Sequence, residues 1–180
     1  MFVAIDRTSK FAFVELHEKA TTAVSRDFLL RLIAAVPYKI HTVLTDNGIQ
    51  FTTPGAGGSA VPLIREAIAT GEPFRAHAFE HACATNDIEH RTTKAKHPWT
   101  NGPVERMNRT IKDATVRRFY YDSHDQLGGH LTDFVSAYNF ARRLKTLKGL
   151  TPYEFICQRW TNEPERFTLN PIQQMPELNS

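Results

Sequence analysis

The stretch HPWTNGPVERMNR, residues 97–109, indicates how the rest of the chain is organised. It begins as a loop and continues as a helix, so that Glu105 falls in the first helical turn. A second stretch, TDNG at residues 45–48, ends an apolar run and places Asp46 where a strand meets a turn. Carboxylates presented by a strand end and a helix start can hold hard divalent cations through oxygen ligands. The two acids are distant in the sequence, so only folding could bring them together.

Each acid also has a structural explanation that needs no metal. Asp46 precedes Asn-Gly and can be an ordinary turn residue. Glu105 can be an acid that complements the helix dipole in a first turn. Spacing alone favours this structural explanation, and the case for a metal site depends on the wider pattern described below.

Composition describes one ordinary globular domain. The chain has 180 residues, of which 41% are hydrophobic and 23% are charged, which suffices for one domain with a core and is short for two. The formal net charge is only +3, but basic residues concentrate in residues 91–118 and 142–148. This distribution suits a polyanionic partner, and a solvated basic face is the alternative. The two cysteines and the lack of a long apolar run or a leader pattern predict a reducing compartment, the cytoplasm, without a membrane.

Hydrophobic periodicity predicts a mixed order of helices and strands. Capping boxes are expected at Ser123–Gln126 and Thr151–Glu154. A hairpin is expected over residues 1–16, strands over 40–45 and 88–92, and helices over 21–36, 62–69, 77–84, 104–119, from 123, and 151–160. We expect residues 1–160 to form the domain and residues 161–180 to form an extended tail.

Two motifs in this order resemble the catalytic core of DDE transposases of the retroviral-integrase type. They are TDNGIQF at residues 45–51 and HPWTNGPVERMNRT at residues 97–110, and the likeness is strongest to bacterial insertion-sequence transposases. The resemblance extends from Met1 to about Pro171 and implies a ribonuclease H-like α/β fold, with a mixed sheet flanked by helices. It further implies metal-dependent cleavage and transfer of DNA strands.

The same resemblance implies roles for the two acids. Asp46 and Glu105 match the family's second and third metal-binding carboxylates, with Mg²⁺ or Mn²⁺ as the cofactor. The separation between them is longer than is usual in retroviral integrases, and the extra length falls in the Gly-rich region after Thr52. We interpret that length as an insertion that leaves the site intact.

Residues near Glu105 are expected to contact DNA. Arg109 and Lys112 follow it by four and seven positions, so all three share one helical face. The resemblance implies that basic residues at these positions touch the DNA end, and the alternative is an ordinary Glu–Arg helix pair. The other residues expected to support the site or contact DNA are Asn108, Arg106, Lys94, Lys96 and Trp99. The resemblance also implies a homo-oligomer acting on element ends and target DNA.

The first of the family's three acids has no counterpart here. In the family it lies on a strand that precedes the one resembling residues 2–5, and Asp6 matches a hairpin-turn Asp that is not catalytic. The first catalytic strand is therefore expected to be missing, and a site with two protein carboxylates should hold its ions poorly and give weak or no activity. Two alternatives stay open: a non-catalytic DNA-binding or assembly remnant, and a ribonuclease H-like nuclease, which the NGPVER context at residues 101–106 disfavours.

Three weaker candidates complete the search. His77 and His81 share a helical face with Cys83 and His90 nearby, but no zinc-ligand pattern is matched and a chance group of histidines is favoured. Cys83 is expected to be a core residue. The aromatic residues 119–121 could stack on bases, although half-buried packing is the favoured explanation.

Overall fold

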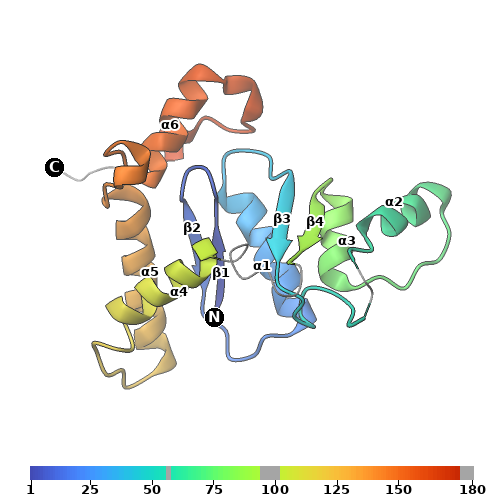
Figure 1. Cartoon of the computed structure of the whole chain (residues 1–180), viewed down its shortest axis with the longest axis horizontal. Helices are drawn as coiled ribbons and strands as arrows, with labels where there is room; N and C mark the ends of the chain where they lie inside the picture. Colours follow the sequence, from blue (N-terminus) through green and yellow to red (C-terminus); the bar gives the residue numbers. More distant parts are fainter. Residues whose placement is uncertain (56–57, 94–101, 175–180) are drawn as a thin grey trace. The chain divides into compact units, whose positions relative to one another are not determined.

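The computed structural model describes residues 1–55, 58–93 and 102–174 (Figure 1). The chain forms two compact units, each with its own core. Unit 1 contains residues 1–2, 17–35 and 40–102, and unit 2 contains residues 3–16, 36–39 and 103–180. Within the described residues, no helix is both long and apolar enough to cross a bilayer.

Unit 1 is built on a pair of parallel strands. Strand β3 (Thr42–Thr45) and strand β4 (Glu89–Thr92) lie side by side in Figure 1, with Thr45 paired to Thr92. Helices α2 (Val61–Thr70) and α3 (Ala78–Thr85) form the crossover that parallel pairing requires. The long connection therefore has a structural purpose, because it returns the chain to the start of the second strand.

The core of unit 1 joins these helices to α1 (Thr22–Ala35). Leu29 of α1, Ile64 of α2, and Phe79 of α3 are each at most 2% exposed and belong to one apolar cluster. The helix ends follow local rules. Thr21 accepts the Val24 N–H at 3.2 Å, and α2 ends at Gly71, whose φ of 72° suits a residue without a Cβ.

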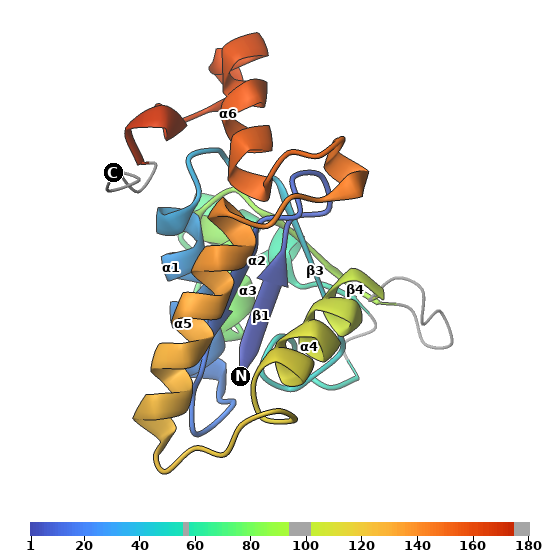
Figure 2. The same ribbon diagram turned by 90° about the vertical axis from the view of Figure 1, so that its left-hand side faces the viewer.

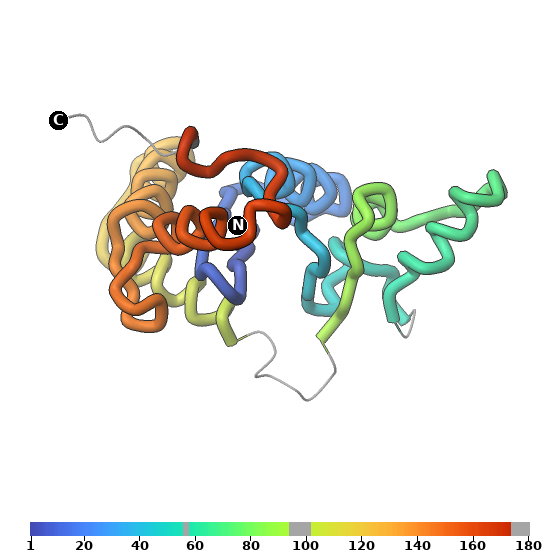
Figure 3. The backbone as a smooth tube through the Cα atoms, turned by 90° about the horizontal axis from the view of Figure 1, so that it is seen from above, coloured from blue at the N-terminus to red at the C-terminus, as the bar shows by residue number. Residues whose placement is uncertain are grey.

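In its described residues, unit 2 combines a hairpin with three α-helices. Strands β1 (Phe2–Ile5) and β2 (Ala12–Glu15) pair with each other, and Figure 2 shows α5 (His124–Phe140) running alongside them. Helix α4 (Gly102–Ala114) contributes Met107 and Ile111 to the core. Figure 3 shows α6 (Pro152–Asn162) following α5 along the chain, and the two helices contact each other.

A buried asparagine on α5 holds strand β2 in place. Asn139 Oδ1 accepts the Ala12 N–H at 2.9 Å, and Asn139 Nδ2 donates to the Ala12 carbonyl at 2.7 Å. Both residues are nearly inaccessible, with exposed fractions of 4% for Asn139 and 1% for Ala12. The side-chain amide thus serves as a one-residue substitute for a neighbouring strand, satisfying two buried backbone groups.

The hairpin turn uses Asp6 structurally. Asp6 Oδ1 accepts the Thr8 N–H at 2.9 Å, and Oδ2 accepts the Ser9 hydroxyl at 2.5 Å and the Tyr38 hydroxyl at 3.1 Å. Burial and the Asp6 charge raise the pKa of Tyr38, so this hydroxyl stays protonated as a donor. These bonds describe a turn-forming acid, as the sequence predicts.

The α/β class predicted from the sequence is confirmed, but one expected detail differs. Where a single mixed sheet was expected, the described strands pair as two separate two-stranded sheets, β1–β2 and β3–β4. Local patterns identify strands without identifying their partners, because pairing depends on contacts distant in the sequence. Thr151 and Glu154 form a complete capping box. Ser123 accepts the Gln126 N–H, but Gln126 Oε1 accepts the Asp122 N–H, so the capping box predicted there is only half formed.

Two boundaries also differ from expectation. Helix α4 ends at Ala114 instead of residue 119, because the Arg117 N–H bonds to the Lys112 carbonyl five residues back and the helical pattern stops. The segment after α6 is not extended throughout. It forms short 3₁₀ turns at Pro164–Arg166 and Pro171–Gln174, and the Tyr153 hydroxyl donates to the Pro171 carbonyl at 3.0 Å. The division at residue 160 stays a prediction.

Candidate metal and DNA site

Asp46 lies directly after β3, on an exposed turn. Its Oδ1 accepts the Gly48 N–H at 2.9 Å, the short-range bond that makes Asp a favoured turn residue. Within the described residues, Oδ2 has no hydrogen-bond partner. The carboxylate therefore faces solvent with one oxygen engaged by its own turn, and it does not face an apolar interior.

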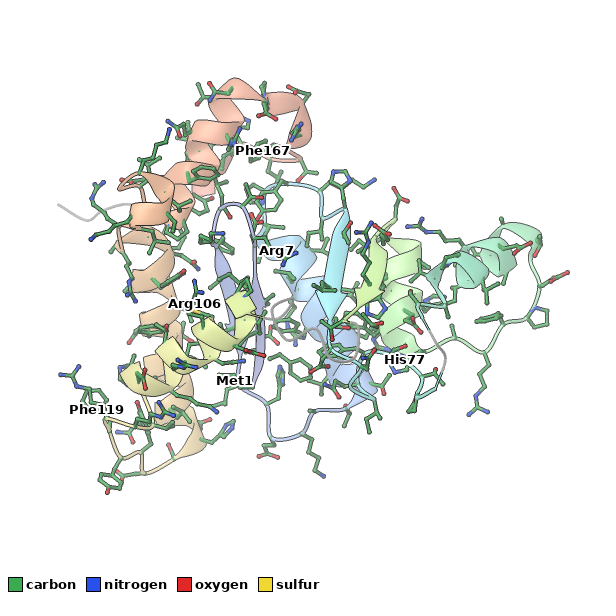
Figure 4. The ribbon with its side chains drawn as sticks, in the orientation of Figure 1. Met1, Arg7, His77, Arg106, Phe119 and Phe167 are labelled. Atoms are coloured by element: carbon green, nitrogen blue, oxygen red, sulfur yellow. The ribbon has the colours of Figure 1, made fainter. Side chains whose placement is uncertain are left out.

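The turn itself is held from several elements of unit 1. Asn47 Nδ2 donates to the Thr93 carbonyl at 2.9 Å, and the Thr93 N–H donates to the Thr45 carbonyl at 2.9 Å, so the turn is bonded to the end of β4. On the other side, His77 Nε2 lies 2.9 Å from the Ile49 carbonyl. His77 comes immediately before α3, as Figure 4 shows. The backbone around Asp46 is thus held by residues that are well separated along the chain.

A buried polar network lies behind the turn. Glu80 and His90 have no side-chain exposure, and His90 Nδ1 lies 3.3 Å from Glu80 Oε1. His90 Nε2 lies 2.9 Å from Thr45 Oγ1, and that hydroxyl donates to the Asp46 carbonyl at 2.8 Å. Burial lowers the pKa of His90, although Glu80 opposes the shift. Sequence reasoning missed this network, and the one signal for it was an acid, Glu80, on an otherwise apolar helix face.

Helix α4 carries the second acid and the expected basic stripe. Glu105, Arg109 and Lys112 are all exposed, and Met107 and Ile111 occupy the opposite, buried face. The shared face predicted from the spacing is therefore present. Within residues 102–174, the structure has no ion pair between Glu105 and Arg109. Arg106 is exposed on the same helix (Figure 4), and Asn108 is half-buried.

The expected site residues are divided between the two units. Asp46 belongs to unit 1 and Glu105 belongs to unit 2, so their meeting stays a prediction. Lys94, Lys96 and Trp99 lie outside the described residues.

The donor chemistry of the two acids suits a hard cation. Both carboxylates are exposed, and carboxylate oxygens are the ligands that Mg²⁺ and Mn²⁺ prefer. In the described parts of the chain, no three His, Cys, Asp or Glu side chains form a group that could hold a metal ion. The spacing around His77 and His81 disfavours a zinc site there.

Cys83 is a core residue, as expected. It is fully buried, and burial raises the pKa of its thiol to about 12, with the Glu80 charge adding to the shift. A thiol with that pKa carries almost no thiolate at neutral pH. Cys83 is therefore unsuited to nucleophilic chemistry.

The aromatic residues after α4 differ in how far they are exposed to solvent. Tyr120 is fully exposed and Phe119, labelled in Figure 4, is 48% exposed. Tyr121 is partly buried, and its hydroxyl lies 2.6 Å from His130 Nδ1. The expected half-buried packing fits Phe119 and Tyr121 and is wrong for Tyr120.

Comparison with known proteins bears directly on this site. Residues 86–152, which include Glu105 and the basic stripe of α4, match the family described as Integrase core domain. A putative integrase of a Spiroplasma virus is 23% identical over 158 residues, which cover 84% of this chain and 40% of that protein. An uncharacterized protein of Caenorhabditis elegans is 26% identical over 112 residues, which cover 62% of this chain and 7% of that protein. The chain thus spans less than half the length of these curated relatives.

Solved structures show the fold. The catalytic core domain of BIV integrase matches with a TM-score of 0.62 at 21% identity, covering 90% of this chain and 88% of that one. The HTLV-2 integrase catalytic core domain, solved in complex with magnesium in a trimeric form, matches with a TM-score of 0.60 at 20% identity, covering 85% and 81%. The protein is therefore an α/β protein with the fold of the retroviral integrase catalytic cores. This likeness confirms the ribonuclease H-like fold that the sequence predicts.

Proposed function

We propose that this chain supplies part of the catalytic core of an integrase-type enzyme that cuts DNA and joins the freed strand to a target, and that its activity alone is weak because the family's first metal-binding acid has no counterpart among its residues. In this proposal Asp46 and Glu105 hold Mg²⁺ or Mn²⁺. Arg109 and Lys112 bind the DNA backbone, assisted by Arg106 and Asn108. Integrases act as assemblies, so the proposal includes self-association of this chain on DNA.

The observation that carries the proposal is the makeup of α4. Its exposed face presents an acid in the first turn and cations four and seven residues later, within the segment that matches the integrase core domain. Arg109 and Lys112 are spaced to lie along a phosphate backbone, where each neutralised phosphate adds electrostatic affinity. The exposed turn at Asp46 supplies a second acid of the chemical type that the same reaction needs.

The residues divide the work of phosphoryl transfer. Divalent ions bound by the two acids would stabilise the attacking and leaving oxygens. Arg109 and Lys112 hold the strand so that its phosphodiester stays beside those acids. The turn bonds around Asp46 keep its carboxylate in one orientation, which lowers the cost of arranging the site.

A strand-transfer assay tests the proposal. Labelled duplex DNA is incubated with the chain and Mn²⁺, and cleaved and joined products are separated by size. Asp46→Asn and Glu105→Gln should each abolish product formation. Glu66→Gln and Asp133→Asn change exposed acids on α2 and α5, and they serve as matched controls that should retain it.

The outcomes separate the competing functions. Product that survives in Asp46→Asn or Glu105→Gln refutes the assigned site. Tight DNA binding by the parent chain without metal-dependent product favours the alternative of a DNA-binding or assembly component. Cleavage without joining favours a nuclease.

A further inference from the structure

Burying the polar side chains of Glu80 and His90 behind Asp46 lowers the stability of unit 1. A fully buried carboxyl loses its hydration, and its partners must compensate for that loss. Glu80 Oε1 accepts the Ala60 N–H at 2.9 Å and faces His90, yet Glu80 Oε2 is buried without a hydrogen-bond partner in the described residues. A buried acid–imidazole pair of this kind is weak evidence for stability, because an apolar pair of the same volume is often as stable or more so.

The geometry of the network points toward the acid. His90 lies two residues before Thr92, which pairs with Thr45, so His90 and Thr45 project from the same face of the two strands. The ring of His90 is packed against Phe79 at 5.2 Å between centroids, which fixes its orientation. Its two nitrogens therefore face Glu80 on one side and Thr45 on the other.

Hydrogen counting shows how the parts depend on one another. The Thr45 hydroxyl has one hydrogen, and it donates that hydrogen to the Asp46 carbonyl. It must then accept from His90, so Nε2 carries a hydrogen. Nδ1 and Glu80 Oε1, 3.3 Å apart, then need one hydrogen between them. Removing Glu80 therefore leaves Nδ1 of His90 without this partner, so the ring that donates to Thr45 is held less firmly.

We propose that Glu80, His90 and Thr45 form a positioning network that fixes the orientation of the Asp46 carboxylate. Glu80 holds the ring of His90 through Nδ1, His90 orients the Thr45 hydroxyl through Nε2, and that hydroxyl fixes the backbone of Asp46. The carboxylate is held in turn by its bond to the Gly48 N–H. This role for the network rests on the proposed function of Asp46 as a metal ligand, since groups behind a ligand commonly set its orientation and affinity.

Two substitutions at one position separate the hydroxyl from the packing. Thr45→Val keeps the branched shape and removes the hydroxyl, and Thr45→Ser keeps the hydroxyl. Thr42→Val makes the same change on the exposed end of β3, where the hydroxyl bonds to Glu89, and it is the matched control. Glu80→Gln tests the far end of the network. An NMR amide spectrum of the whole chain shows whether each variant folds. If Thr45→Val does not fold, the result for Glu80→Gln decides whether the network exists.

The first readout needs no metal. Hydrogen exchange of the Gly48 amide reports the bond to Asp46 Oδ1. Exchange should be faster in Thr45→Val and Glu80→Gln than in the parent chain, and unchanged in Thr45→Ser and Thr42→Val. Equal exchange rates in all variants overturn the positioning network, whatever the metal data show.

The second readout uses Mn²⁺ alone as the probe. Paramagnetic broadening of the amides of residues 46–48 measures binding, and Thr45→Val should weaken it roughly tenfold while Thr45→Ser does not. The proposed function is contradicted if Mn²⁺ causes no broadening in the parent chain, or if the broadening persists in Asp46→Asn. Neither result concerns the network. Broadening that requires Asp46 but is equal in Thr45→Val and Thr45→Ser contradicts the network alone.

Discussion

Substitution of Asn139 is the sharpest test of the packing in unit 2. Asn139→Ala removes both hydrogen bonds to Ala12, and it leaves a buried N–H and a buried carbonyl without partners. Each unsatisfied buried group costs about 1–3 kcal/mol, so the free energy of unfolding should fall by about 4 kcal/mol. Urea unfolding followed by circular dichroism measures this change.

A second variant distinguishes hydrogen bonding from simple loss of volume. Asn139→Asp keeps an acceptor for the Ala12 N–H but sets a carboxylate oxygen against the Ala12 carbonyl. Burial and that oxygen should raise the pKa of the introduced carboxyl above its usual ~3.9. Because the folded-state pKa is raised, the stability of Asn139→Asp should be greatest below about pH 4 and fall as the pH rises through the folded-state pKa.

The control is Asn162→Ala, at the exposed end of α6, which should change stability little. The reasoning is refuted if Asn139→Ala costs less than about 1 kcal/mol, the net value of one ordinary hydrogen bond. It is also refuted if Asn139→Asp shows the same pH dependence as the parent chain.

Four further outcomes are expected. Arg109→Gln and Lys112→Gln should each reduce the slope of log affinity against log salt for DNA by about 0.9, measured by fluorescence anisotropy. Cys83 should resist alkylation by iodoacetamide in the folded protein at neutral pH, because burial raises its thiol pKa to about 12, and mass spectrometry should find it modified only after unfolding. Burial lowers the pKa of His90 below its usual ~6.5, so the unfolded chain takes up this proton first and the urea midpoint should fall as the pH drops below about 6.5. Thr151→Ala breaks a complete capping box, and it should cost about 1 kcal/mol in the same urea experiment.

Each of these outcomes has a clear contradiction. An unchanged salt slope would remove Arg109 or Lys112 from the DNA surface. Rapid alkylation of native Cys83 would mean that the core of unit 1 opens readily. A urea midpoint that is flat between about pH 7 and about pH 5 would contradict the burial of a neutral His90. A Thr151→Ala variant as stable as the parent would show that the helix end is held by other contacts.

Local chemistry predicted most of the elements correctly. Proline, capping residues and hydrophobic spacing act within a few positions, so the start of α6 at Thr151 and the strand before Asp46 could be located from the sequence. The end of α4 was missed because a switch to a longer backbone bond at Arg117 has no local signal. The pairing of strands into two small sheets was missed for a similar reason, since partners are chosen by contacts across the fold.

The candidate site was predictable only in part. The exposed face shared by Glu105, Arg109 and Lys112 follows from helical geometry, and the structure has it. The network of Glu80, His90 and Thr45 joins a helix to two strands across a crossover, and no residue spacing signals such a network. Whether Asp46 and Glu105 share ions depends on how the two units are arranged, and it stays a prediction.

Because β3 pairs with β4, the turn at Asp46 can fold only after the ribosome has synthesised β4. A ribosome makes Asp46 long before it makes His90, and folding of such non-local contacts waits for the later segment. A half-made chain therefore carries this acid on loose backbone, without the His90 imidazole that contacts the Thr45 hydroxyl. The Asp46 turn can therefore take its folded form only after translation has passed β4.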